Sequence, residues 1–99
     1  MKTRGRKAAR AEPALVLRLY VAGASPHSVA ALANLKAIEA GQRCRFQLEV
    51  VDVLEHPARA LADSILVTPT LVKVSPEPAC RILGSLRDTA LVMRSLGLT

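Results

Sequence analysis

Two cysteines, Cys44 and Cys80, carry the most reactive side chains in this sequence. Disulfide exchange needs a thiolate with a lowered pKa and a second thiol that resolves the mixed disulfide, and a Cys-x-x-Cys pair usually supplies both. The two cysteines lie far apart, and the chain contains no such pair. Arg43 and Arg45 flank Cys44, so a stabilised thiolate there is an alternative to the simpler interpretation of an unreactive surface thiol. We expect Cys80 to be a half-buried residue of a strand.

Four other polar side chains are of types that catalysis or metal binding often uses. His27 and His56 have no carboxylate or cysteine at metal-ligand spacing, which argues against a metal site. Ser25 lies outside any Gly-x-Ser-x-Gly motif, and a helix-capping role accounts for it. Asp52 ends an apolar run, where hydrogen bonding is a commoner role than catalysis. We therefore expect no catalytic residue, no metal and no cofactor in a protein that is not an enzyme.

The formal charge of +6 is concentrated at the start of the chain. Five basic residues and Glu12 give the first twelve residues a net charge of +4, which leaves +2 for the rest. Tyr20 and Phe46 are the only aromatic residues, so almost no ring is available to stack on bases. Nucleic-acid binding is therefore not expected, and phosphate binding by the basic arm is kept as an alternative.

The length of 99 residues predicts one domain. We assign residues 1–13 to a basic, disordered arm and residues 14–99 to the folded domain. No apolar run reaches the length of a membrane span, and no secretory signal is recognisable. A cytoplasmic protein without membrane contact is expected.

Apolar patterning predicts a strand, a helix and a second strand in the first half of the chain. Residues 14–22 are apolar nearly throughout, as in a strand covered on both faces, with Arg18 at an edge or near an end. Ser25 caps a helix that begins at the following proline and ends at Gly41. Residues 45–54 form the second strand, half exposed at first and then fully covered. The expected buried face of the helix is Val29, Leu32, Leu35 and Ile38.

Prolines mark the elements that follow. Pro57 opens a short helix that runs to about Asp63. Pro69 stands between two threonines, just ahead of a β-branched run, and proline cannot donate a ladder hydrogen bond inside a central strand. A strand must therefore begin at this point, and Thr68-Pro69 is our candidate for a cis peptide bond.

The last third of the chain reads as a hairpin and a helix. Residues 70–74 and 79–83 are expected to pair around a turn that contains two prolines. Ser85, with Asp88 three residues later, resembles a capping box that begins the final helix. The resulting order, β-α-β-α-β-β-α with a mixed sheet, is the thioredoxin-like topology of the α/β class.

Four segments also occur in the order and spacing of one known family. They are Leu17-Arg18-Leu19-Tyr20-Val21-Ala22-Gly23, Ser25-Pro26-His27-Ser28, Val51-Asp52-Val53-Leu54 and Ile65-Leu66-Val67-Thr68-Pro69-Thr70-Leu71. With these segments the sequence resembles the KaiB family of circadian clock proteins, from about residue 15 to residue 96. The sensor domain of SasA-type histidine kinases is a close competitor.

Resemblance to KaiB implies a protein without redox activity that binds a KaiC-type ring ATPase. Binding is expected to modulate the phosphorylation or signalling state of the ATPase. A SasA-like histidine kinase is expected to compete for the same ATPase. It also implies a homo-oligomer, dimer or tetramer, whose second half can instead fold in the order β-α-β-β-α-α-β. The switched region maps to residues 56–96. The residues expected to govern the switch are Pro57, Pro69, Pro76, Pro78, Gly84 and Ser85.

The same resemblance implies a partner-binding surface. The residues expected to contact the partner are Ala24, Ser25, Pro26, His27, Lys36, Lys73 and Arg81. Glu55, Ser64 and Cys80 stand where the family usually has basic residues. This loss of positive charge predicts a KaiC surface that differs from the cyanobacterial one. The alternatives are a thiol protein acting through Cys44 and a sensor-type interaction domain of a SasA-like signalling system.

Overall fold

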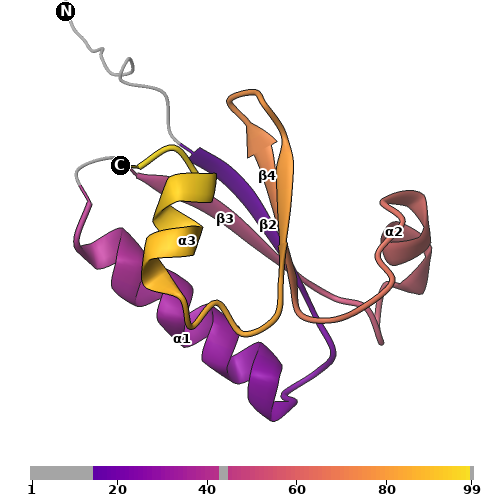
Figure 1. Ribbon diagram of the computed structural model, residues 1–99. Helices are drawn as coiled ribbons and strands as arrows, with labels where there is room; N and C mark the ends of the chain where they lie inside the picture. Colours follow the sequence, from indigo (N-terminus) through magenta and orange to yellow (C-terminus); the bar gives the residue numbers. More distant parts are fainter. Residues whose placement is uncertain (1–14, 43–44, 99) are drawn as a thin grey trace, which may run out of the picture.

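The computed structural model describes residues 15–42 and 45–98 and has the thioredoxin-like arrangement (Figure 1). The elements are β2 (Leu15–Val21), α1 (Pro26–Ala40), β3 (Phe46–Asp52), α2 (Pro57–Ala62), β4 (Thr70–Ser75), β5 (Cys80–Leu83) and α3 (Thr89–Ser95). The strand order is β3-β2-β4-β5, with β2 and β3 parallel and the other two pairings antiparallel. The predicted element order and mixed sheet are confirmed, and the alternative order is not the one adopted here. The basic arm and Cys44 lie outside the described residues.

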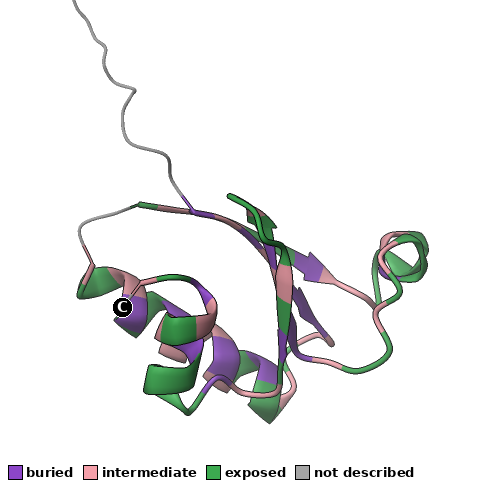
Figure 2. Ribbon diagram, turned by 45° about the horizontal axis from the view of Figure 1, so that its top comes forward, coloured by how far each residue is buried: buried purple, intermediate pink, exposed green. Residues whose placement is uncertain are grey.

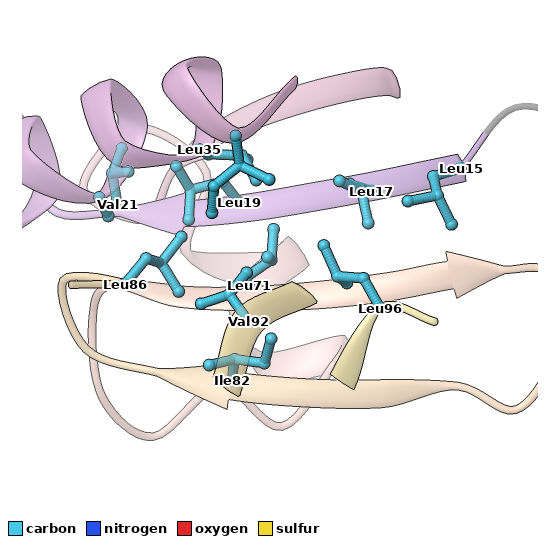
Figure 3. Close-up of a cluster of buried hydrophobic side chains, with 12 residues drawn as sticks. Leu15, Leu17, Leu19, Val21, Leu35, Leu71, Ile82, Leu86, Val92 and Leu96 are labelled. Atoms are coloured by element: carbon cyan, nitrogen blue, oxygen red, sulfur yellow. The ribbon is translucent and has the colours of Figure 1, made fainter. Parts of the chain in front are cut away.

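Helices α1 and α3 cover one face of the sheet, and α2 lies on the other side (Figure 1). Alternate residues of β2 point at α1, because successive side chains of a strand face opposite sides. Figure 3 shows the resulting cluster of leucine, isoleucine and valine side chains between the sheet and the two helices. Its buried members are Leu15, Leu17, Leu19, Val21, Ala31, Leu35, Ile38, Leu71, Ile82, Leu86, Val92 and Leu96.

Three expectations about burial were wrong. Arg18 lies in β2, a central strand, and not at an edge; its side chain tolerates this place because it points away from the core and pairs with carboxylates. Val29 is exposed, since the face of α1 that packs on the sheet passes through Ser28, Ala31, Leu35 and Ile38. The end of the predicted second strand is not fully covered: β3 ends at Asp52, and Leu54 is exposed in the turn that follows.

The helix caps differ from the predicted ones in two places. The side chain of Asp88, not Ser85, caps α3 by accepting a hydrogen bond from the Leu91 amide at 3.1 Å. Ser85 instead uses its carbonyl oxygen to accept from Asn34 Nδ2 at 2.9 Å. Ser25 precedes α1 as predicted, but its hydroxyl makes no capping bond. The peptide bonds before Pro69, Pro76 and Pro78 are cis.

Candidate functional site

The loop between β2 and α1 is tied to the end of β3 through Asp52. Gly23 has a φ of 55°, a conformation that glycine adopts without strain, and its amide donates to Asp52 Oδ1 at 3.0 Å. The same carboxylate oxygen accepts from the Leu54 amide at 2.9 Å. The hydrogen-bonding role predicted for Asp52 is therefore confirmed. The loop is held where the carboxyl ends of two parallel strands meet, which is where α/β folds commonly place their sites.

This loop contains no thiol. Ala24, Pro26 and His27 are exposed, while Ser25 donates its hydroxyl proton to Ser28 Oγ at 2.8 Å. Pro69 lies at the same end of the sheet, since Thr70 pairs with Tyr20. A thioredoxin-like enzyme would need cysteines in the loop to exchange disulfides, and residues 24–27 of this loop are alanine, serine, proline and histidine.

The remaining reactive groups lie apart from one another. Cys80 is half buried on β5, and its sulfur lies 3.4 Å from the carbonyl oxygen of Ser95. Within residues 15–42 and 45–98 no three histidine, cysteine or acidic side chains gather as metal ligands would. No helix in this part of the chain is long and apolar enough to cross a membrane.

The three basic residues predicted to bind the partner do not form one surface. Lys36 is exposed on α1. Arg81 is exposed on the opposite face of the sheet, because its neighbour Ile82 points into the core. Lys73 is only 5% exposed and lies beside Gly97, so it has almost no surface to offer a partner in this conformation. Loop residues 24–27 are the predicted contacts that do cluster.

Sequence reasoning missed an apolar groove between α2 and the segment that leads into β4. The groove has a volume of about 480 Å³ and its lining is largely aliphatic. Leu61 is 79% exposed and Leu66 is 92% exposed at its rim, and the exposed Leu83 lines a neighbouring hollow that shares Leu66 with the groove. The lining residues are Val53, Pro57, Ala60, Leu61, Ile65, Leu66, Val67 and Thr68. We call this set the apolar groove; the run of three aliphatic residues before Thr68-Pro69 was its only sequence signal.

Ionic contacts fasten α2 to the sheet beside this groove. Arg59 binds both carboxylate oxygens of Glu49, at 2.6 and 2.9 Å. Arg18 bridges two acids, Glu49 at 3.1 Å and Asp63 at 2.9 Å. Tyr20 donates its hydroxyl proton to the same oxygen of Asp63. Arg81 donates to the carbonyl oxygens of Asp63 and Ser64. We call Arg18, Tyr20, Glu49, Arg59, Asp63 and Arg81 the polar network.

Comparison with known proteins establishes the family of this chain. The family model described as KaiB domain matches residues 18–98. The chain belongs to the KaiB family. It is 49% identical over 84 residues to the circadian clock oscillator protein KaiB of Synechococcus elongatus, which covers 84% of this chain and 82% of that protein. The KaiB of a Nostoc species is 46% identical over 90 residues, 90% of this chain and 83% of the relative.

Solved structures support the same fold. The N-terminal domain of Synechococcus elongatus SasA superposes with a TM-score of 0.73 at 23% identity, covering 99% of this chain and 92% of that domain. Chloroplastic thioredoxin z superposes with a TM-score of 0.70 at 23% identity, covering 85% of this chain and 76% of the other. At this identity the two structures establish the thioredoxin-like fold of this KaiB family member and nothing further.

The polar network lowers the pKa of both of its carboxyl groups. Hydrogen bonds from Arg59, and then from Arg18, lower the pKa of Glu49 from 4.5 to about 2. The hydrogen bond from Tyr20, followed by that from Arg18, lowers the pKa of Asp63. Burial, and then the bond to Asp63, raises the pKa of Tyr20. Near neutral pH the two carboxyl groups are therefore ionised and the Tyr20 hydroxyl is protonated, which are the forms that make these contacts.

A pH dependence of stability follows from these shifts. Because both carboxyl pKa values are lower in the folded chain than in the unfolded chain, the unfolded chain binds more protons in acid. We expect the free energy of unfolding to fall from about pH 5 toward about pH 2, and the Glu49→Gln variant to show a shallower fall. Urea unfolding followed by circular dichroism at several pH values measures this. Glu77→Gln, at an exposed turn position, is the control, and an equally shallow curve for it would contradict the assignment.

Proposed function

We propose that this chain is a KaiB-type regulator that binds a KaiC-type ring ATPase in the cytoplasm and changes its phosphorylation or signalling state. Membership of a family whose relatives are named circadian clock oscillator proteins supports a clock or timing role. The observation that carries the proposal is the apolar groove, which lies open and is flanked by Leu61 and Leu66, the two most exposed large aliphatic side chains among the described residues. Clustered exposed aliphatic side chains beside a cavity are typical of a protein interaction site.

The groove combines exposed apolar surface with a charged group beside it. Leu61 and Leu66 stand at its rim with most of their surface free, so burying them under a partner removes apolar area from water. Arg59 precedes the groove residue Ala60 on α2 and adds a charged group beside it, as interface rims usually have. Loop residues 24–27 lie at the same end of the sheet as Val53 and Thr68 of the groove, and their role in binding is a separate proposal.

Binding, and not catalysis, is the activity we assign. The loop at the start of α1 has no cysteine to attack a disulfide, and Cys80 lies on the hairpin strand with its sulfur next to a backbone carbonyl. Redox function would therefore have to use Cys44 alone. A single thiol needs an external thiol to resolve its mixed disulfide, so this chain cannot complete a cycle of disulfide exchange by itself.

The proposal extends to a competitor and to a resting state. The fold shared with the SasA N-terminal domain supports competition between this chain and a SasA-like histidine kinase for one site on the ATPase. We further propose a resting homo-oligomer, dimer or tetramer, and a switch of residues 56–96 between two folds. If the binding form is a minor fraction, the apparent affinity falls by that fraction, so the fold equilibrium can set the timing of binding.

Size-exclusion chromatography with a purified KaiC homologue tests the proposal. We expect this chain to co-elute with the ATPase ring in the presence of ATP and to lose the complex when the SasA N-terminal domain is added in excess. Light scattering on the free chain reports the resting oligomer. Failure to co-elute at high micromolar concentration, with and without ATP, would reject the proposed partner.

A further inference from the structure

Helix α2 is attached to the molecule with very little apolar burial. It has six residues, of which only Ala60 is buried. Helices of this length do not persist on their own in water, so tertiary contacts must hold it. Figures 1 and 2 show α2 standing clear of the other helices, beyond the end of the strands and largely exposed. A buried alanine contributes too little to account for its fixed position.

Hydrogen bonds and ion pairs from residues of the strands hold α2 in place. Arg59, within the helix, holds Glu49 of β3 with two hydrogen bonds. Asp63 is the residue after the helix, and its carboxylate accepts hydrogen bonds from Arg18 and Tyr20 of β2. Its backbone carbonyl oxygen accepts a hydrogen bond from Arg81 of β5. Three of the four strands therefore hold the two ends of one helical turn.

The sheet register explains why these side chains converge. Arg18 pairs with Glu49 on one side and with Val72 on the other, and Val72 pairs with Arg81. Directly opposed residues point to the same face of a sheet, so the three charged side chains form a row across the face opposite α1. Arg18 stands in the middle of the row and is the residue that joins both acids.

We propose that the polar network is a latch that positions the apolar groove, with Arg18 as its central positioning residue. The groove wall consists of α2 and the residues that follow it, so their position sets its shape. Holding a binding surface in its bound form lowers the ordering cost of association. The binding part of this inference rests on the proposed function. The positioning part does not.

Hydrogen exchange at three amides reports the latch directly. The amides of Asp63, Ser64 and Ile65 donate to carbonyl oxygens of α2, and their exchange follows local opening of this segment. We expect Arg18→Gln to accelerate their exchange about 3- to 10-fold, since two ion pairs are lost, while amides of α3 keep their rates. Arg87→Gln, which removes an exposed arginine from the loop before α3, is the charge-matched control and should leave all of these rates unchanged.

A double-mutant cycle shows whether the contacts act as one unit. Arg18→Gln and Arg59→Gln each remove one partner of Glu49. If the network is coupled, the acceleration of exchange in the double variant differs from the product of the accelerations in the two single variants. Unchanged exchange at Asp63 and Ile65 in Arg18→Gln would overturn the latch, and so would equal acceleration throughout α3, which would indicate global destabilisation.

Binding to the ring of a KaiC homologue supplies the second measurement. We expect the Arg18→Gln variant to bind about 3- to 10-fold more weakly than the wild type, and the Arg87→Gln variant to bind normally. Accelerated exchange with unchanged affinity would overturn the binding part of the inference, because the position of α2 would then have no effect on the partner. Accelerated exchange in a protein whose wild type does not bind the ring would leave the latch in place and reject the proposed function.

Discussion

The Leu66→Glu variant is expected to lose binding to the KaiC-type ring by a factor of about 30 or more, while folding normally. Leu66 is 92% exposed, so a carboxylate there costs the free chain nothing in buried apolar contacts. In the complex the same carboxylate would lie in an apolar interface and lose its water. A loss of about 2 kcal/mol or more is typical when a central interface residue is disrupted. Surface plasmon resonance with immobilised ring, together with thermal unfolding of the free variant, measures both quantities.

Leu91→Glu is the matched control for this variant. Leu91 is an exposed leucine at the third position of α3, on the opposite side of the sheet from the apolar groove. Glutamate is favourable at this position of a helix, because it can accept a hydrogen bond at the amino end. We expect normal binding. Normal binding by Leu66→Glu, with weakened binding by a His27→Ala variant, would move the interface from the groove to the loop at residues 24–27.

Leu71→Ala is expected to lower the free energy of unfolding by about 3 kcal/mol. Leu71 is 0% exposed on β4, where it pairs with Leu19 on one side and with Ile82 on the other. Truncating it leaves a cavity that a closely packed core cannot fill. For a domain of this size the loss corresponds to a fall in melting temperature of roughly 10 to 20 °C. Urea and thermal unfolding measure it.

Leu66→Ala provides the contrast, because it removes the same atoms from an exposed site. We expect it to change the free energy of unfolding by less than about 0.5 kcal/mol. A loss below about 1 kcal/mol for Leu71→Ala would mean that the free chain does not keep this packing of β4 in solution. That result would favour the second fold that the KaiB resemblance implies for residues 56–96.

The loop before α1 and the apolar groove beside α2 are the two candidate surfaces of this chain. The loop before α1 keeps its anchoring through Gly23 and Asp52 but has no sulfur chemistry to position. On the other side of the sheet, α2 has six residues and leaves aliphatic side chains exposed beside it. The apolar groove beside α2 is the binding surface that we propose.

Local patterns in the sequence were sufficient for the elements. The apolar run that became β2, the Ser25-Pro26 start of α1 and the stop at Gly41 each depend on residues next to one another in the chain. Intrinsic preferences and binary patterning act at this range. The phase of α1 was the exception, since Val29 and Ser28 both fit a helical face and only the packing against β2 selected Ser28.

The cap of α3 shows a second limit of local reasoning. Ser85 and Asp88 are both good capping residues, and the sequence favoured the first. Burial of Leu86 and the bond from Asn34 to the Ser85 carbonyl hold residues 85 and 86 against α1, so the helix begins only after Asp88. A contact across 51 residues therefore decided between two locally equivalent caps.

By itself the sequence determined the family, the order of the elements and the absence of a thiol pair, because these depend on residue identity and neighbouring residues alone. Only the tertiary structure decided where a partner could bind. The apolar groove arises because α2 leaves aliphatic side chains uncovered, and the polar network joins Arg18 to Glu49 and Asp63, which lie 31 and 45 positions away. Strand order and register set those distances in space, and they follow from the packing of the whole chain.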